Sequence, residues 1–380
     1  MNHVVFPGLE LANFRLAEAD NLQTPALIIY PEHIDNNILV TLKLANGRAN
    51  RWRPHFKTSK MEFTARRLVG HGISNFKCAT TLELLTLCES GASDVNVAFP
   101  MTGANARRVI EIASENPSVR VSAIIEDPAE IQIWKSGNVS LFIDINPGMN
   151  RTGLDQDRIA EICSLASAIR SAGISFRGLH YYDGHLGAFA MADRTAPAHV
   201  GYTQVLQIVD ALEAGRIDVE EVITSGTPAF QCALTFTPFT NARFIHRVSP
   251  GTVVYADTMV RASLGDLGYI PAAVVMTSVI SHPSKYRITA NAGHKAVSAD
   301  MGAPTCAIIG HGDWLPSAPS EEHLPIDLPD GAVLPDLGAS LYLVPRHVCP
   351  TVNNFDHAVI AEGGHVRQAE PVSARGHERP

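Results

Sequence analysis

Short apolar runs that alternate with helical-looking segments constrain the fold of this chain most strongly. Eight runs are predicted to be strands: Arg53–Lys57, Asn75–Ala79, Val95–Phe99, Val121–Glu126, Leu141–Asn146, Phe176–Tyr182, Val222–Gly226 and Phe244–Val248. Helical spacing of apolar residues marks segments between them, at Met61–Val69, Leu82–Ser90, Ala104–Ser114 and Arg158–Ala172. Eight strands alternating with helices predict a parallel (β/α)8 barrel. Because strand counting does not show closure, a doubly wound open sheet is the alternative.

The pattern changes after Asp257, where helical periodicity nearly disappears. Short predicted strands follow at Val274–Ser281, Tyr286–Ala290, Cys306–Gly310, Ala339–Val344 and Ala358–Ala361, separated by proline, glycine and aspartate. We therefore expect an α/β chain with a barrel domain at residues 24–257 and an all-β domain at residues 258–370. The early run Ala26–Tyr30 has two possible places. It either adds a strand to the barrel or, as part of residues 24–31, joins the β domain.

Composition excludes several classes of protein. The chain has 380 residues, 46% apolar and 18% charged, which is enough for a large core. Its formal net charge of −8 argues against nucleic acid as the main partner. No apolar run reaches the ~18 residues of a membrane-spanning helix, and Met1–Arg15 lacks the basic start of a secretory signal. The six cysteines show no CxxC spacing, so we expect reduced thiols in a cytoplasmic protein without a membrane partner.

Glycine–threonine pairs follow the seventh and eighth predicted strands, where barrels commonly bind a phosphate. They lie in the runs Ser225-Gly226-Thr227 and Pro250-Gly251-Thr252. Glycine lets a backbone N–H approach an oxyanion, and the threonine hydroxyl adds a second donor. The two runs predict a phosphate site, with ordinary strand-ending turns as the alternative.

Lys57 ends the first predicted strand, in the run Arg53-Pro54-His55-Phe56-Lys57. A lysine at the carboxyl rim of a barrel, with a phosphate site opposite, is what a pyridoxal phosphate Schiff base requires. His55 shares the face of Lys57 and is placed to tune its charge. An ordinary surface lysine is the alternative.

His347 and Cys349 form the second candidate constellation, in the run Val344-Pro345-Arg346-His347-Val348-Cys349. On an extended segment, residues two apart point to the same face. Imidazole and thiolate together suit zinc or a similar borderline metal. Two protein ligands leave positions open for substrate, whereas a structural zinc normally takes four. A purely structural role for the pair is the alternative.

Taken together, these motifs resemble the D-serine dehydratase / D-threonine aldolase family. The resemblance rests on the lysine run, the Ser-Gly-Thr-Pro and Pro-Gly-Thr turns, Asn291–Asp300, and the ending His-Val-Cys-Pro-Thr-Val-Asn. It extends from about Thr24 to Asp356. It implies a fold-type III pyridoxal phosphate enzyme with an alanine-racemase-like barrel, a C-terminal β domain, a divalent metal and a homodimeric state.

The resemblance also implies roles for single residues. Lys57 is the expected Schiff-base lysine, and His347 and Cys349 are the expected ligands of zinc, or of manganese, cobalt or magnesium. Residues expected at the cofactor phosphate are Ser225, Gly226, Thr227, Gly251 and Thr252. Arg151 and Tyr182 are expected near the cofactor ring, although Tyr181 is an alternative to Tyr182 there. His185 and Tyr181 are the candidate catalytic acids. Ser59 departs from the family, which often has histidine at that position.

A β-hydroxy D-amino acid is the implied substrate, and dehydration is the implied reaction. In the family, His with Cys accompanies dehydration and His with Asp accompanies aldol cleavage. We expect conversion of 3-hydroxy-D-aspartate to oxaloacetate and ammonia, closely followed by D-serine to pyruvate and ammonia. The alternative is a D-threonine or 3-hydroxy-D-aspartate aldolase that releases glycine and an aldehyde. A racemase or a cofactor carrier leaves the pair of His347 and Cys349 unexplained.

Overall fold

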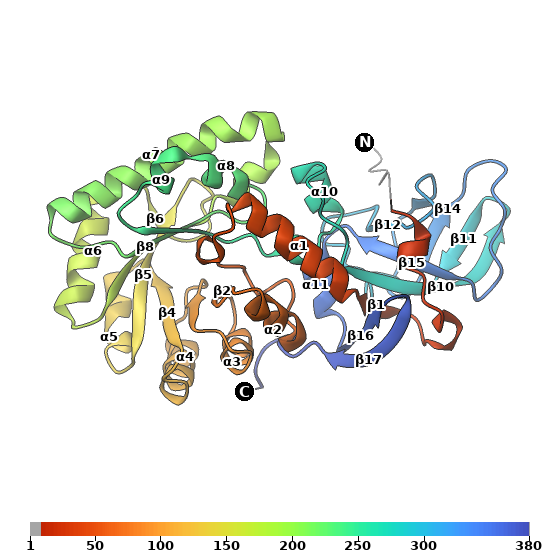
Figure 1. The fold of residues 1–380 in the computed structure, drawn as a ribbon, viewed down its shortest axis with the longest axis horizontal. Coiled ribbons are helices and arrows are strands. Elements are labelled where there is room, and N and C mark those ends of the chain that lie inside the picture. The colour runs from red at the N-terminus through yellow and green to blue at the C-terminus, as the bar shows by residue number, and fades with distance from the viewer. Residues whose placement is uncertain (1–8, 380) are drawn as a thin grey trace. The chain divides into compact units, whose positions relative to one another are not determined.

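The computed structural model describes residues 9–379, which form two compact units (Figure 1). The barrel unit comprises Thr41–Lys57, Glu62–Gly251 and the residues from Gly376 onward. The β unit comprises the residues up to Val40, Thr58–Met61 and Thr252–Arg375. The start of Met1–Arg15, on which the expectation of no signal segment partly rests, lies outside the described residues.

Parallel strands build the barrel unit, in the order β2-β3-β4-β5-β7-β8-β9. They are β2 (Asn75–Cys78), β3 (Asp94–Val97), β4 (Arg120–Ile125), β5 (Val139–Asn146), β7 (Phe176–Tyr181), β8 (Glu221–Thr224) and β9 (Ile245–Val248). A short strand, β6 (Leu154–Asp155), pairs only with the end of β5. Every neighbouring pair in this order is parallel, as the alternation with helices predicts.

The segment before Lys57 closes this sheet into a barrel. Trp52 bridges to β9 at Val248, and His55 bridges to β2 at Lys77, both in the parallel sense. The N–H of Arg53 donates to the carbonyl of Val248 at 2.9 Å, and the N–H of Phe56 donates to Lys77 at 2.7 Å. Both edges of the sheet are thereby paired, which confirms the predicted barrel over the open sheet. The predicted strand Arg53–Lys57 is not a continuous strand, because it pairs only through isolated bridges and a turn begins at Phe56.

Helices cover the outer side of these strands (Figure 1). They are α2 (Glu62–Gly70), α3 (Thr81–Glu89), α4 (Gly103–Glu115), α5 (Ile131–Trp134), α6 (Ile159–Ser171), α7 (Met191–Ala214), α8 (Phe230–Thr235) and α9 (Thr237–Thr240), while α1 (Pro31–Leu44) runs from one unit into the other. In α4 the buried residues Ala106, Val109 and Ala113 recur at helical spacing. The hydroxyl of Thr80 accepts the N–H of Glu83 at 3.1 Å and so caps the start of α3. The four predicted helices are thereby confirmed.

The barrel interior is layered. A charged layer lies at the amino ends of the strands, where Arg53 donates to both Asp94 and Glu221 at 2.9 Å. Arg177 pairs with the same two carboxylates, and Arg247 pairs with Glu221. The carboxylates share three guanidinium groups, and these hold the pKa of Asp94 and of Glu221 low although burial opposes ionisation. This layer fixes the orientation of Arg53, four residues before Lys57.

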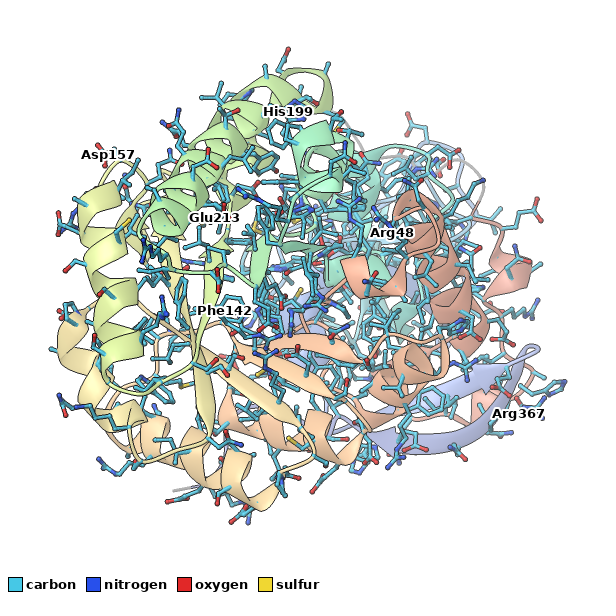
Figure 2. All side chains as sticks on the ribbon, turned by 60° about the vertical axis from the view of Figure 1, so that its left-hand side comes forward. Arg48, Phe142, Asp157, His199, Glu213 and Arg367 are labelled. Carbon is cyan, nitrogen blue, oxygen red and sulfur yellow. The ribbon has the colours of Figure 1, made fainter. Side chains whose placement is uncertain are left out.

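An apolar layer separates these charges from the barrel mouth. It consists of Ile124, Phe142 and Ile223 from β4, β5 and β8. Figure 2 labels Phe142, which lies amid the strands. The guanidinium of Arg177 lies 5.2 Å from the centre of the Phe142 ring. The polar groups above this layer are therefore separated from the ion network below it.

The β unit is built on a mainly antiparallel sheet with the order β13-β14-β11-β10-β1-β16-β17, in which β15 also pairs with β10 and β12. The strands are β1 (Ala26–Ile29), β10 (Ala273–Ser284), β11 (Arg287–Ala290), β12 (Cys306–Ile308), β13 (Leu315–Pro316), β14 (Leu324–Asp327), β15 (Ser340–Pro345), β16 (His357–Glu362) and β17 (His365–Pro371). Strand β1 pairs antiparallel with β10 and parallel with β16. The early run Ala26–Tyr30 therefore belongs to this sheet and adds no strand to the barrel.

Both faces of the β unit's central strand are buried. Val274 and Met276 of β10 pack in one apolar cluster with Phe14 and Tyr342, while Val275 packs in a second cluster. Burial on both faces explains why this run is continuously apolar. Two short helices, α10 (Thr258–Leu264) and α11 (Val348–Asn353), interrupt the predicted all-β pattern, so this unit is mainly β. No helix among residues 9–379 combines the length and apolar character needed to cross a membrane.

Candidate active site

Lys57 lies immediately after the barrel-closing segment, at the carboxyl end of the strands. Its side chain is exposed, and its backbone N–H donates to His55 Nδ1 at 3.3 Å. The nearby bridge of His55 to Lys77 holds the backbone before the turn in place. Carboxyl ends of strands carry the chemistry in barrels of this kind. The structure therefore places an accessible amine where the sequence predicts the cofactor lysine.

A row of buried polar side chains lies beside Lys57, and none of its members belongs to the motifs predicted from the sequence. Lys77 Nζ lies 3.3 Å from His180 Nε2, and His180 Nδ1 lies 2.6 Å from Asp144 Oδ1. The hydroxyl of Thr152 donates to Asp144 Oδ2 at 2.7 Å. Lys77, His180 and Asp144 are each at most 3% exposed. Each interrupts an apolar strand (Phe-Lys-Cys, Leu-His-Tyr, Ile-Asp-Ile), and this interruption is the signal that could have found them.

Burial and neighbouring charges shift the pKa values of Lys77, His180 and Asp144. Burial lowers the pKa of Lys77, the charge of Lys57 lowers it further, and Asp144 only partly compensates, which leaves it at about 7. Burial and the charge of Lys77 also lower the pKa of His180. Burial opposes ionisation of Asp144, but His180 and Thr152 outweigh it and lower its pKa. This row of side chains thus contains an ionised carboxylate, Asp144, and a lysine that titrates near neutral pH, Lys77.

Tyr182 is the tyrosine that faces this interior. The guanidinium carbon of Arg151 lies 4.9 Å from the centre of its ring, and Lys77 Nζ lies 5.6 Å away. The ring is packed between two glycines, because a Cβ on Gly184 would lie 2.4 Å from it and one on Gly226 would lie 2.7 Å from it. Arg151, Tyr182 and Gly226 of the predicted cofactor site are therefore brought together.

Tyr181 points away from this group. A Cβ on Gly201 of α7 would lie 2.0 Å from its hydroxyl, and its ring contacts Tyr202 edge to face. Burial also raises its pKa, which disfavours ionisation. Tyr181 and Tyr182 are adjacent on a strand end, so they point to opposite sides. This position argues against both predicted roles of Tyr181, at the ring and as an acid.

The loop after β8 presents backbone donors. Ser225 itself is wholly buried, and its hydroxyl pairs with Tyr202 at 2.9 Å and donates to Asp183 at 3.0 Å. Ser225 therefore supports the loop and offers no free hydroxyl to a phosphate, contrary to the role expected of its side chain. The N–H groups of Gly226 and Thr227 donate no hydrogen bond to any other described residue. These two amides are suited to an oxyanion such as the cofactor phosphate.

The remaining barrel candidates, Gly251 and His185, lie at the same end of the strands. Gly251 packs on the segment before Lys57, because a Cβ there would lie 2.3 Å from the carbonyl oxygen of His55. His185 is half-buried in η5 (Gly184–Ala188), and its Nδ1 is buried without a partner among residues 9–379. Thr252 belongs to the β unit, where its hydroxyl lies 3.7 Å from Cys349 Sγ.

The barrel residues fit the predicted cofactor. Two unpaired backbone amides, glycines that leave no room for a Cβ and an exposed lysine are the features a phosphate-bearing aldehyde needs.

His347 and Cys349 lie in the β unit, in a different conformation from the one predicted. His347 precedes α11, and Cys349 is the second residue of that helix, so the segment is not an extended strand. The two side chains are nevertheless hydrogen-bonded to each other. The helix start is held by Asp257, whose Oδ2 accepts the N–H of Val348 at 3.0 Å.

The groups around His347 are suited to orient its imidazole as a metal ligand. Asp300 Oδ2 lies 2.6 Å from His347 Nδ1, so a metal would bind this ring through Nε2, the nitrogen on the side of Cys349. Burial favours the neutral ring, but Cys349 and Asp300 outweigh it and raise the pKa of His347 to about 9. The hydroxyl of Thr58 lies 3.1 Å from Cys349 Sγ. A carboxylate behind a ligating histidine is a common metal-site arrangement.

No group of three or more His, Cys, Asp or Glu side chains among residues 9–379 converges on a metal position. The prediction for this pair is an ion with two protein ligands and open positions for substrate. Imidazole and thiolate donors fit zinc and related transition ions.

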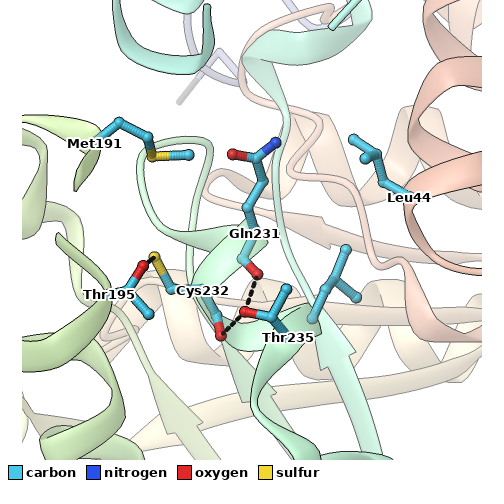
Figure 3. A pocket seen from close by; sticks show the side chains of 7 residues that line it. Leu44, Met191, Thr195, Gln231, Cys232 and Thr235 are labelled. Carbon is cyan, nitrogen blue, oxygen red and sulfur yellow. Dashed lines mark hydrogen bonds between the residues drawn. The ribbon is translucent and has the colours of Figure 1, made fainter.

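A further pocket of the barrel unit is lined by α7 and α8 residues together with Leu44 (Figure 3). Thr195 Oγ1 lies 3.7 Å from Cys232 Sγ, and the hydroxyl of Thr235 donates to backbone carbonyls of α8. None of the predicted site residues lines this pocket. It is therefore separate from the group around Lys57 and Tyr182.

Comparison with protein families agrees with this architecture. Residues 29–258 match the model of the alanine racemase N-terminal domain, and residues 272–361 match that of the putative serine dehydratase domain. Barrel and site thus define the class of alanine-racemase-like proteins. The chain belongs to the alanine racemase N-terminal domain family, with a D-serine dehydratase-like segment following the barrel. This family depends on pyridoxal phosphate.

Individual relatives cover nearly the whole chain. D-threonine aldolase of an Arthrobacter species is 25% identical, and 3-hydroxy-D-aspartate aldolase of Paracoccus denitrificans is 27% identical, each over 94% of both chains. D-threo-3-hydroxyaspartate dehydratase of a Delftia species is 23% identical over 90% of this chain and 95% of its own.

Solved structures show the same fold. D-threonine aldolase of Filomicrobium marinum superimposes with a TM-score of 0.84 over 94% of this chain and 96% of its own, at 24% identity. The Delftia dehydratase superimposes with a TM-score of 0.79 over 95% of this chain and 99% of its own, at 20% identity. A D-threo-3-hydroxyaspartate dehydratase of the same fold has also been solved as a histidine-to-alanine variant and as a metal-free cysteine-to-alanine variant, at positions two residues apart.

Proposed function

We propose that this protein is a pyridoxal phosphate- and divalent metal-dependent lyase that dehydrates a β-hydroxy D-amino acid. The best candidate substrate is 3-hydroxy-D-aspartate, converted to oxaloacetate and ammonia, and D-serine, converted to pyruvate and ammonia, is the next. Relatives over the full length of the chain act on D-threonine, 3-hydroxy-D-aspartate and D-threo-3-hydroxyaspartate, which supports a β-hydroxy D-amino acid.

The thiol of Cys349 next to His347 is the observation that carries dehydration. A D-threo-3-hydroxyaspartate dehydratase of the same fold has histidine and cysteine at the same two-residue spacing, and its cysteine variant was obtained metal-free. By that resemblance, His347 and Cys349 would hold the metal, with Asp300 orienting the imidazole. A divalent ion so held makes a β-hydroxyl a better leaving group.

The barrel residues have separate tasks in this proposal. Bound pyridoxal phosphate acidifies the Cα–H of an amino acid by delocalising negative charge. Lys57 would hold the cofactor and then accept the Cα proton at Nζ. The amides of Gly226 and Thr227 would bind the phosphate, and Gly251 would leave room beside His55. Arg151 and Tyr182 would position the ring.

Aldol cleavage is the second candidate, and the relatives favour it. Two of the three characterised full-length relatives named above are aldolases, and the aldolase structure gives the higher TM-score. The same parts allow both reactions, because a metal can also stabilise the alkoxide from which the Cα–Cβ bond breaks. A 3-hydroxyaspartate also needs a cation for its second carboxylate, and Arg151 and Arg346 are the candidates for that role. The homodimer remains a prediction.

A spectroscopic test addresses the cofactor and the metal. The wild-type protein reconstituted with pyridoxal phosphate should show the yellow absorbance of lysine-bound cofactor, and it should release ammonia from D-serine or a 3-hydroxyaspartate until a chelator is added. Lys57→Ala should lose the absorbance, whereas Lys135→Ala, an exposed lysine of the same unit, should keep it. Colour that survives in Lys57→Ala, or activity that survives chelation, would contradict the proposal.

A further inference from the structure

Lys77 is placed directly beside the segment that carries Lys57. Its backbone N–H donates to the carbonyl of Pro54 at 3.0 Å, and its carbonyl accepts the N–H of Phe56 at 2.7 Å. The side chain is only 2% exposed and lies above the apolar layer of the barrel. Water therefore does not reach this amine freely, and its protons must come through the site or through buried partners.

Its buried partners form a directional chain. Because Asp144 is ionised and lies 2.6 Å from His180 Nδ1, that nitrogen carries the ring proton. His180 Nε2 is then a bare acceptor that faces Lys77 Nζ at 3.3 Å. A proton on Lys77 can pass to His180, and a proton on His180 can return.

The charges that face Lys77 come from every side of the barrel. Lys57 and Arg151 disfavour its protonated form, whereas Asp144 and Asp183 favour it, and the face of the Tyr182 ring lies 5.6 Å away. Burial and the cations outweigh the carboxylates and leave the pKa at about 7. An acid–base group whose pKa lies near the working pH transfers protons most effectively.

An unpaired amide lies next to it. Asn96 of β3 is the register partner of Lys77, so the two side chains lie on the same face. Asn96 is completely buried, and neither its Nδ2 nor its Oδ1 has a hydrogen-bond partner among the described residues. Buried amides are normally paired, so this one indicates that a polar group of a ligand or a water completes the site beside Lys77.

We propose that Lys77 is a second acid–base residue of the barrel site, which gives a proton to the substrate after Lys57 has accepted one, and which exchanges protons with His180 and Asp144. This inference rests on the proposed lyase function. In dehydration the Cα–H bond breaks and its proton goes to Lys57 Nζ. The Cβ–O bond then breaks with its electron pair on oxygen, and a proton from Lys77 Nζ converts the leaving hydroxide to water. Transfer of the proton from Lys57 to Lys77 then returns both lysines to their starting protonation states.

The protonation state of Lys77 is measurable without turnover. In protein labelled with ¹³C at lysine Cε, the Lys77 signal is identified by its loss in Lys77→Arg. In wild type it should titrate within about one pH unit of neutrality, and in Lys57→Met its midpoint should rise because a cation is removed. His180→Gln should shift it as well. A Lys77 signal that stays in its charged form up to pH 9 would overturn the inference and indicate a structural ion pair.

Kinetics of the cofactor-loaded protein test the catalytic role. Lys77→Met and Lys77→Arg should keep the cofactor absorbance but lower kcat about 100-fold or more, with KM changed less than threefold. His180→Gln should keep more activity and shift the neutral limb of the kcat–pH profile. A kcat within threefold of wild type in both Lys77 variants would overturn the inference. Loss of cofactor colour from wild type or its persistence in Lys57→Ala would instead overturn the proposed function.

Discussion

Asp300 Oδ2 lies 2.6 Å from Nδ1 of His347, so Nε2 is the ring nitrogen through which this histidine would bind a metal. Its carboxylate fixes the tautomer that binds a metal through Nε2.

Asp300→Asn should therefore weaken metal binding without abolishing it. Loss of such a carboxylate typically raises the metal dissociation constant about 10–100-fold. Cys349→Ala should remove most of the metal, while Cys163→Ala, a half-buried thiol of the barrel unit, should have no effect. Metal titration monitored by calorimetry is the measurement. Unchanged affinity in Asp300→Asn would show that the contact is only structural.

Gly226→Ala should weaken cofactor binding. An added Cβ would lie 2.7 Å from the Tyr182 ring and would displace either that ring or the loop that carries the free amides. Gly70→Ala is the control, because nothing lies within 4 Å of the Cβ it would add. Equilibrium titration of the apo protein with pyridoxal phosphate, followed by absorbance, should show a weaker site only in Gly226→Ala. Equal affinities in both variants would place the phosphate elsewhere.

The buried position of Lys77 predicts a pH-dependent effect on stability. Its folded pKa, about 7, lies below the ~10.4 of an unfolded lysine. The unfolded state therefore binds more protons between these two values, and stability rises with pH there. The cost of burying a lysine that would be charged in the unfolded state is on the order of a few kcal/mol. This cost is complete below pH 7 and is lost above pH ~10.4.

Urea unfolding of wild type and Lys77→Met from pH 6 to 10 tests this. Lys77→Met should be relatively more stable at pH 6, and its advantage should shrink as the pH rises. A difference that does not change with pH would mean that Lys77 is charged in both states throughout.

Disruption of the ion network at the amino ends of the strands should lower the free energy of unfolding without directly changing the residues around Lys57. Asp94→Asn removes a carboxylate that two buried arginines share, and breaking a buried pair costs about 3–5 kcal/mol. Asp327→Asn, at an exposed pair with Arg287, should change the free energy of unfolding little. Urea unfolding measures both variants. An Asp94→Asn protein as stable as wild type would show that the arginines relax without cost.

Much of the fold could be predicted because the spacing of apolar residues along the sequence shows which faces of a helix or strand are buried. The continuous apolar runs of the barrel strands and the helical spacing of residues such as Val109 follow directly from which faces are buried. The place of Ala26–Tyr30 could not be predicted, since its partner strands β10 and β16 lie in the last third of the sequence. The helix at Cys349 could not be predicted, because its six residues are too few to show a helical period and its start is held by Asp257 from a distant segment.

The site was predictable only in part, for a similar reason. Lys57, Gly226 and Cys349 stand in motifs, so their chemistry can be recognised locally. Lys77 and His180 are single polar residues in apolar strands, and only the register of the barrel brings them within 3.3 Å. The choice between Tyr181 and Tyr182 likewise depends on which side of β7 each faces.

The most direct test of the account is the partition of products from 3-hydroxy-D-aspartate in the metal- and cofactor-loaded protein, with 2-oxo acid and glycine measured in parallel. We predict oxaloacetate and ammonia in equal amounts, little glycine, and loss of both products on chelation. Glycine with an equal amount of aldehyde, and no oxo acid, would contradict dehydration and identify the enzyme as an aldolase.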